Sequence, residues 1–205
     1  MNGHAARAAM PAQSVQPADK AEKREAILDA ALKLFAERGF HGTSVPDIAQ
    51  LARVGAGTIY RYFDGKEALV NALYQRHKKE LGLALLNGFD AKASPRASFH
   101  HFWNAAIGFA TASPRAFQFL ELHHHAPYLD PKSRALETEL LGLADQFITA
   151  ASEREIFKDV PSGVLLALVW GAFRGLVQGG CEGRISLTKK IISQAEECVW
   201  EAIRR

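Results

Sequence analysis

The sequence has few of the features that mark secreted or membrane proteins. It contains two cysteines, Cys181 and Cys198, which are too few for a disulfide framework and favour a reducing compartment. The longest apolar run, residues 164–173, stops at Arg174, short of the roughly 18 residues that a membrane helix needs. The N-terminal residues lack the apolar run of a signal peptide. We therefore expect a cytoplasmic protein without a membrane segment, in which residues 1–19 form a flexible tail.

Motifs for catalysis are also missing. The sequence has no Gly-x-Ser-x-Gly elbow and no Gly-rich phosphate loop. The run His123-His124-His125 is the clearest metal signal, but successive helical residues point about 100° apart and cannot all reach one ion. Glu121 with His124 or His125 has a usable spacing, yet no second pair or cysteine completes a ligand set. We therefore predict no enzyme, no cofactor and no metal, and assign the histidines to a pocket or to helix ends.

The positive charge is concentrated in one part of the chain. The 205 residues carry a formal net charge of +3 and are 48% hydrophobic, which is enough for a sizeable core. Residues 20–81 hold 11 Lys and Arg against 8 Asp and Glu, whereas residues 82–205 hold 13 of each sign. This excess is modest for a nucleic-acid binder, so we expect two copies of the chain to act on one DNA site.

Residues 43–63 have the pattern of a helix-turn-helix. Ser44 can cap a first helix, with Pro46 in its first turn and Asp47 placed as in a capping box. Residues 53–55, Arg-Val-Gly, interrupt this helix, and the glycine is an acceptable cap for the next one. We expect the second helix to begin at residue 56 and to run for about two turns.

The second helix leaves few side chains to bury. Ile59 and Phe63 are one turn apart and can pack on the first helix, while the remaining side chains are small or polar. Glycine admits a phosphate backbone closely, hydroxyls donate to phosphate oxygens, and arginine reaches base edges. These side chains would equally suit a solvated surface, but their combination favours DNA. The predicted DNA contacts are Thr43, Tyr60, Tyr62 and Lys66 on phosphates, Gly57, Thr58 and Arg61 for sequence readout, and the neighbouring Gly55 and Ala56.

This motif resembles the DNA-binding domain of TetR/AcrR-type transcriptional regulators. The resemblance covers residues 23–73 and rests on the Gly-Thr-x-Tyr-x-Tyr-Phe run at residues 57–63 and on the Lys-Glu pair that follows. Arg53 stands where the family usually has Gly, so we expect a left-handed backbone there at a cost of about 1–2 kcal/mol. Gly55 replaces the usual Ser, so its contact with a phosphate would come from the backbone N–H alone.

Helical periodicity predicts an all-α chain, and the resemblance divides it into an N-terminal three-helix, helix-turn-helix DNA-binding domain over residues 20–65 and a C-terminal helical ligand-binding and dimerisation domain over residues 66–205. A long helix over residues 66–86 would connect the two. Further helix starts are expected at Ser94-Pro95, Ser113-Pro114, Asp130-Pro131 and Val160-Pro161, and a last helix over residues 187–204.

The second domain is rich in aromatic residues. Such residues at helical spacing are usually ordinary core, but the family places an effector-binding domain here, and an apolar pocket with a few polar groups is the expected form of such a site. The predicted lining residues are Phe102, Trp103, Ile107, Phe117, Leu120, His124, Tyr128, Phe147 and Phe173.

The last two helices offer more apolar surface than one protomer of this size needs. This surplus predicts a two-fold dimer through a four-helix interface, and the family dimerises through the same two helices. The predicted interface residues are Leu168, Gly171, Gly175, Ile191, Ala195, Val199 and Ala202.

Taken together, the residues predict a homodimeric transcriptional regulator, most simply a repressor. It would bind a palindromic double-stranded DNA operator with half-sites about 34–36 Å apart or somewhat more, and a small apolar or aromatic effector would release it. Two other readings stay open: a metal- or His-dependent enzyme in a helical bundle, and a helical adaptor that binds protein.

Overall fold

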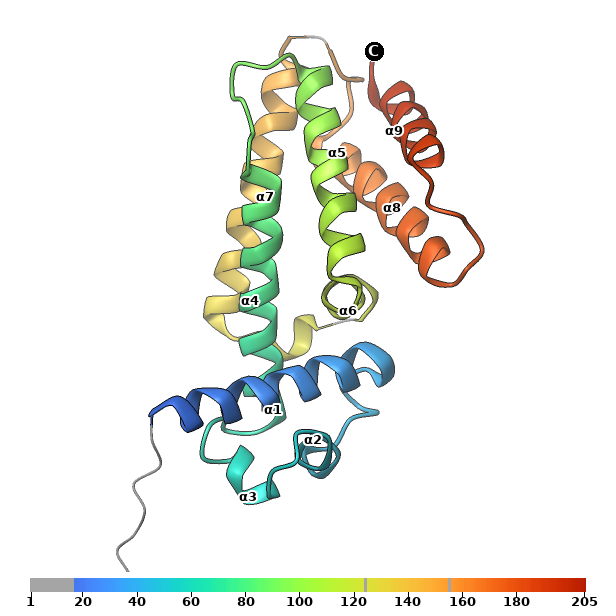
Figure 1. Ribbon diagram of the computed structural model, residues 1–205. Coiled ribbons are helices and arrows are strands. Elements are labelled where there is room, and N and C mark those ends of the chain that lie inside the picture. The colour runs from blue at the N-terminus through green and yellow to red at the C-terminus, as the bar shows by residue number, and fades with distance from the viewer. Residues whose placement is uncertain (1–16, 124, 155) are drawn as a thin grey trace, which may run out of the picture.

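The computed structural model describes residues 17–123, 125–154 and 156–205, and no strand is formed within them. The all-α prediction is therefore confirmed. Figure 1 shows α1, α2 and α3 grouped at one end of the molecule and an upright bundle above them. The helices are α1 Pro17–Arg38, α2 Val45–Leu51, α3 Ala56–Ile59, α4 Lys66–Leu86, α5 Pro95–Ala112, α6 Pro114–Phe117, the π-helix η1 Gln118–Leu122, the 3₁₀ helix η2 Ala126–Tyr128, α7 Pro131–Ser152, α8 Ser162–Cys181 and α9 Lys189–Ile203.

Helix α1 organises the N-terminal group. Its apolar side chains recur at helical spacing, and Ile27, Ala31 and Phe35 are fully buried. Gly39, with φ +67°, ends the helix in the left-handed conformation that glycine adopts without strain. The helix begins at Pro17, so the last three residues of the predicted tail are helical; residues 1–16 lie outside the described part of the chain.

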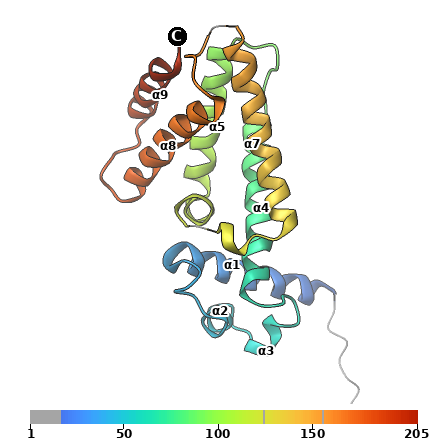
Figure 2. The same cartoon turned by 180° about the vertical axis from the view of Figure 1, so that it is seen from behind.

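Helix α4 joins the two parts, as expected from residues 66–86. Figures 1 and 2 show it rising from the three-helix group into the bundle, where it packs between α5 and α7. The carboxamide of Asn71 ties it to the start of α7: Nδ2 donates to the carbonyl of Tyr128 at 2.8 Å, while Oδ1 accepts from the amide of Asp130 at 2.8 Å and from the hydroxyl of Ser133 at 2.7 Å. Helix α4 is therefore held firmly near its first turns.

The predicted helix starts fall into two groups. Ser94 accepts from the amide of Ala97, and Asp130 accepts from that of Ser133, so both cap their helices as expected. The helix start at Ser113-Pro114 is also confirmed, because α6 begins at Pro114, but Ser113 does not cap the helix with its side chain as predicted. Its amide still closes α5 and its carbonyl already opens α6, and at φ −132°, ψ 62° its side chain makes no capping bond. The helix expected after it also breaks into α6 and η1, which ends at Leu122.

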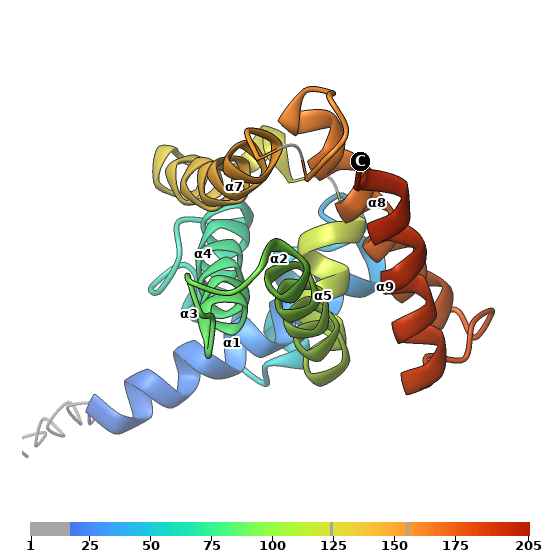
Figure 3. The same cartoon turned by 90° about the horizontal axis from the view of Figure 1, so that it is seen from above.

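Helices α8 and α9 lie along the outside of the bundle (Figure 3). Helix α8 packs on α5, α7 and α9 but buries little of its surface, and Val164 and Leu168 are 46% and 54% exposed. By length and composition alone, α8 could cross a membrane, and it passes that test alone among the helices of the described residues. The dimer interface predicted on this outer helix is a different reason for its apolar face.

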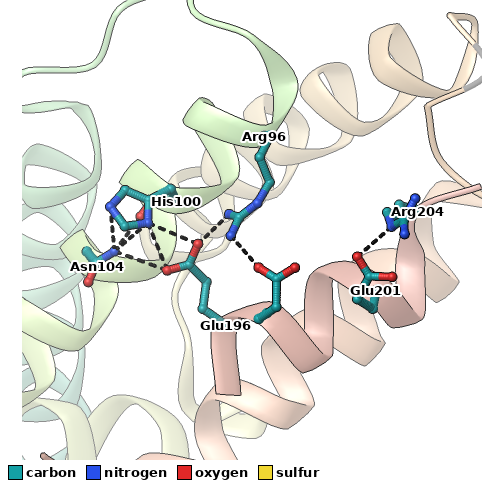
Figure 4. A network of polar contacts seen from close by, with 7 residues as sticks. Arg96, His100, Asn104, Glu196, Glu201 and Arg204 are labelled. Carbon is teal, nitrogen blue, oxygen red and sulfur yellow. Dashed lines mark hydrogen bonds and ion pairs between the residues drawn. The ribbon is translucent and has the colours of Figure 1, made fainter. Parts of the chain in front are cut away.

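A polar network fastens α9 to α5 (Figure 4). Its centre is Glu196, whose side chain is 2% exposed and accepts from Arg96 and from Nδ1 of His100, the latter at 2.8 Å. Arg96 also donates to Glu197 at 2.8 Å and lies over the ring of Trp200, 5.3 Å from its centroid. Burial works against the charge of Arg96, but the hydrogen bonds to the two carboxylates prevail and raise its pKa. Helix α9 therefore has a defined orientation on the bundle.

Candidate nucleic-acid interface and ligand cavity

The first helix of the predicted motif begins as its sequence indicates. The hydroxyl of Ser44 accepts from the amide of Asp47 at 3.2 Å, and the carboxylate of Asp47 accepts from the amide of Ser44 at 3.3 Å. This reciprocal pair is a complete capping box. The hydrogen bonds from the Ser44 side chain and backbone lower the pKa of Asp47, so this cap stays charged at more acidic pH than an ordinary aspartate would.

The turn between α2 and α3 has the predicted backbone. Arg53 has φ +56°, the one positive value among the described residues other than glycine. This left-handed residue lets the amide of Val54 reach the carbonyl of Ala49 at 3.0 Å and directs the chain into the next helix. Gly55 then caps α3 through its backbone, with its carbonyl accepting from Thr58 at 2.8 Å. The guanidinium at residue 53 stays exposed beside the motif.

Helix α3 is shorter than the two turns expected. It spans Ala56–Ile59, and the chain then continues in turns, with the amides of Tyr62 and Phe63 both reaching the carbonyl of Ile59, at 2.9 and 3.0 Å. Ile59 and Phe63 are 0% and 7% exposed, so the two predicted anchors are confirmed. They fix one side of the segment and leave its other side outside the core.

The outer side of α3 carries most of the predicted DNA contacts. Tyr60 is 59% exposed, and Gly55, Ala56, Gly57 and Arg61 are also exposed. The half-buried pair is Thr58 and Tyr62, and the Tyr62 ring packs against the core. Figures 1 and 2 place α3 at the end of the molecule farthest from α8 and α9, and within the described residues no other element covers this side. The geometry thus brings seven of the nine predicted residues onto one short segment.

Thr43 and Lys66 do different work from the predicted phosphate contacts. Thr43 is 2% exposed, and its hydroxyl donates to the carbonyl of Gly39 at 2.9 Å. The Lys66 ammonium donates to the carbonyls of Phe40 and Thr43 at 2.6 and 2.8 Å and lies 4.0 Å from the centroid of the Phe40 ring. Both side chains therefore hold the loop between α1 and α2. The prediction missed this role because local spacing does not reveal that this loop folds back over the start of α4. Thr43 and Lys66 are therefore not among the proposed DNA contacts.

The second domain contains a cavity of about 200 Å³ between α4, α5, α7 and α8. Four of the predicted residues line it: Phe102, Trp103, Phe147 and Phe173. Most of the remaining lining comes from aliphatic residues of helices that the prediction hardly used, namely Gly82, Leu85, Leu86, Leu140, Leu143, Ala144, Ile148, Leu165, Leu166 and Val169. Their helical spacing places them on the apolar faces of their helices but does not say which residues of those faces surround a space. Leu86 and Leu143 are about half exposed, so the cavity reaches solvent between α4 and α7.

The other predicted pocket residues lie elsewhere. Ile107, Phe117 and Leu120 are buried in the core, at 6%, 1% and 6% exposure, and do not line the cavity. Tyr128 is at the junction of the two domains, where its ring stacks on that of Phe40 with 3.8 Å between centroids. The predictions for Phe117 and Leu120 are wrong because α6 and η1 turn away from the cavity to pack on α1. Those for Ile107, in α5, and Tyr128, in η2, are wrong because other residues of α5 and none of η2 line the cavity. His124 lies outside the described residues.

His123 and His125, on either side of residue 124, pack near the junction between the two domains. Nε2 of His123 donates to the carbonyl of Ala36 in the last turn of α1 at 2.8 Å, which is a helix-end role as predicted. His125 is 4% exposed and donates through Nε2 to the carbonyl of Phe119 at 2.5 Å. No three His, Cys, Asp or Glu side chains come together as a possible metal site in the ranges that the structure describes.

The predicted dimer residues form one open face on α8 and a partly covered row on α9. Leu168, Gly171 and Gly175 are exposed on α8, and a Cβ at either glycine would meet no atom within 4 Å. On α9, Ile191, Ala195 and Val199 are half-buried, while Ala202 is exposed. Nothing within the protomer therefore explains two glycines one turn apart on α8, and their place in an interface stays a prediction.

Comparison with known proteins agrees with this architecture. The domain described as bacterial regulatory proteins, tetR family, matches residues 27–73, and the tetracyclin repressor-like C-terminal domain matches residues 74–205. Their boundary lies within α4. A TetR family transcription regulator from Marinobacter aquaeolei VT8 has the same fold, with a TM-score of 0.79, 24% identity and coverage of 92% of this chain and 99% of that chain.

Curated relatives match about half of the chain or less. The regulator RutR of Escherichia coli strain K12 is 35% identical over 109 residues, which are 52% of this chain and 51% of that protein. The repressor KstR2 of Rhodococcus jostii strain RHA1 is 36% identical over 89 residues, or 40% of this chain and 44% of that protein. The match thus spans about half of these relatives or less, while the two domain models together extend from residue 27 to residue 205. The chain is a member of the TetR family of helix-turn-helix transcriptional regulators.

Proposed function

We propose that this regulator is a homodimeric repressor that places α3 of each protomer in the major groove of a palindromic operator. The observation that carries the proposal is the outer side of α3 and of the turn after it, where Gly57, Thr58, Tyr60 and Arg61 lie together outside the core of the described residues. A Cβ at Gly57 would meet no atom within 4 Å, so the fold itself does not require glycine there. A phosphate backbone that approaches closely from outside would supply the requirement.

In this proposal, different residues of the α3 segment contact different parts of the DNA. Arg61 and Thr58 read base edges, Tyr60 and Tyr62 donate their hydroxyls to phosphates, and Gly55 and Ala56 offer backbone N–H groups at the start of α3. Because α3 is one turn long, few residues can reach the bases, and operator affinity depends on joining two half-sites in one dimer.

The test of the interface is Arg61→Ala. We expect a loss of about 1–3 kcal/mol in operator affinity together with a relaxed base preference at one position of each half-site. Binding-site selection from random duplexes, followed by anisotropy titrations of the selected operator, measures both effects. Arg154→Ala, at another exposed arginine that follows α7, is the control and should bind as the unaltered protein does. Equal affinity and equal base preference for both variants would remove Arg61 from the site.

We further propose that a small apolar or aromatic effector enters the cavity and releases the operator. Helix α4 supports this coupling, because its C-terminal half lines the cavity with Gly82, Leu85 and Leu86, while its first residue begins beside the α2–α3 unit. A ligand that binds more tightly when α4 is tilted spreads the two α3 segments, with a coupling of about 1–3 kcal/mol. Compounds that raise the melting temperature should also release a labelled operator. The role proposed here is cytoplasmic and requires no catalytic activity.

A further inference from the structure

The cavity between α4, α5, α7 and α8 is lined almost entirely by hydrocarbon groups. Its lining residues are aliphatic or aromatic apart from Gly82, and none of them carries a charge. The backbone groups of Gly82 lie in the interior of α4, where the helix pairs its amides with carbonyls one turn away. Among the described lining residues, Trp103 and Trp170 are the ones whose side chains have a hydrogen-bond donor. Whether a ligand finds a polar partner in the cavity therefore depends on these two indoles.

Neither indole N–H is available to a ligand in the cavity. Trp170 donates its Nε1–H to the carboxylate of Glu121 at 2.7 Å, so this group is satisfied within the protein. Trp103 is 3% exposed, and its Nε1 has almost no accessible surface, so a ligand atom in the cavity cannot reach it. The Trp103 ring packs against those of Phe99 and Phe173, each with its centroid 6.1 Å away. Within the described residues, the cavity thus offers apolar surface and no free hydrogen-bond donor.

Such a surface selects against polar groups in a ligand. A carbonyl or hydroxyl that moves from water into this cavity loses its hydrogen bonds to water and gains none in return, and a charged group loses still more. Hydrocarbon surface has no such bonds to lose, and it gains free energy in proportion to the area removed from water. Aromatic rings from α5, α7 and α8 form much of the wall, and their faces and edges pack well on an aromatic guest.

We infer that the ligand of this cavity is an uncharged hydrocarbon, a single aromatic ring with a short substituent, which binds by shape and apolar contact without a hydrogen bond. This inference rests on the proposed effector cavity and narrows its ligand class. The size agrees, because an apolar cavity of about 150 Å³ binds benzene and this one of about 200 Å³ has room for a short substituent.

Three probes of the same shape test the absence of a polar partner. α-Methylstyrene is a hydrocarbon, acetophenone replaces its methylene group with a carbonyl oxygen, and benzoate carries a charged carboxylate at the same position. Calorimetric titration of the full chain without DNA measures each affinity. We expect α-methylstyrene to bind at least about 10-fold more tightly than acetophenone, and benzoate to show no binding. Acetophenone that binds as tightly as the hydrocarbon, or benzoate that binds at all, would overturn the inference.

A variant that fills the cavity tests the location of the bound hydrocarbon. Ala144 lines the cavity from α7, so the larger side chain of Ala144→Leu should weaken α-methylstyrene binding by at least about 10-fold. Ala150→Leu, at an exposed alanine of the same helix, is the matched control and should bind the probe as the unaltered protein does. Equal affinities of the two variants would place the probe outside the cavity and overturn the inference. The comparison of probes on the unaltered protein does not depend on whether either variant folds.

The result is separable from the proposed function. If acetophenone and α-methylstyrene bind equally well, the effector cavity stands and the hydrocarbon class fails. If none of the three probes binds, the ligand class fails, while the screen for compounds that release a labelled operator still decides the effector part of the proposed function. The DNA-binding part is decided independently by Arg61→Ala.

Discussion

The outer faces of α3 and α8 are both made of side chains that the protomer does not use, yet their chemistry is opposite. Helix α3 presents hydroxyls, a guanidinium and glycine, whereas α8 presents Val164, Leu168 and two glycines. The first set suits a hydrated polyanion and the second suits another apolar helix. Exposure alone therefore does not identify a partner. The chemistry of the exposed atoms indicates which kind of partner binds.

The largest expected effect comes from placing a charge on the α8 face. Leu168→Glu should separate the dimer, because a carboxylate buried between two copies of α8 has no partner. Operator affinity should then fall by at least about 100-fold as the two half-sites are no longer joined. Light scattering and anisotropy measure the two losses. Leu83→Glu, at a 70% exposed leucine of α4, is the control and should remain dimeric; a dimeric Leu168→Glu protein would refute the assignment of α8.

The next effect concerns the network that orients α9. Removing one partner of a buried ion pair costs about 3–5 kcal/mol, but Arg96 is 38% exposed and keeps Glu197, so we expect Glu196→Gln to cost about 1–2 kcal/mol. Urea unfolding measures this loss. Glu197→Gln, at a 56% exposed carboxylate, should change the unfolding free energy by less than about 0.5 kcal/mol. If the two variants proved equally stable, the buried carboxylate would not hold α9.

The glycines of the two faces provide a matched pair. Gly57 and Gly171 lie in helices with open space at the position of a Cβ, so alanine should stabilise either protomer by about 0.4–1 kcal/mol. Gly57→Ala should nevertheless weaken operator binding about 5- to 10-fold without altering dimerisation, while Gly171→Ala should weaken the dimer. Thermal unfolding, anisotropy and sedimentation distinguish these outcomes. Two variants that share one phenotype would erase the distinction between the faces.

The smallest expected effect is a pH-dependent change in the free energy of unfolding. It comes from the Asp130 cap at the start of α7. The amide of Ser133 donates to Asp130 and is the main cause of its lowered pKa, so the charged cap stabilises the fold fully above its ordinary value of 3.8. This contribution is lost as the pH falls through the lowered pKa. Asp130→Ala should cost about 1 kcal/mol at pH 7 and nearly nothing once the cap is protonated. Asp130→Asn keeps a capping oxygen and should show a flatter acid profile in urea unfolding.

The predictions that succeeded depend on neighbours in the sequence. The capping box of Ser44 and Asp47 and the left-handed backbone of Arg53 are decided within one or two helical turns. The predictions that failed depend on where distant segments meet. Lys66 is held by a loop more than twenty residues earlier, and Tyr128 stacks on Phe40. The cavity is similar: aromatic spacing found Trp103 and Phe173, but which buried residues enclose a space is a property of four packed helices.

The ammonium of Lys66 has a mechanical consequence. It joins the first residue of α4 to two carbonyls of the loop that leads into α2, and the Phe40 ring beneath it is stacked in turn on Tyr128. The first turn of α4 is thus fixed to the helix-turn-helix unit by direct hydrogen bonds. If the C-terminal end of α4 tilts by a small angle, we expect α2 and α3 to rotate with its N-terminal end.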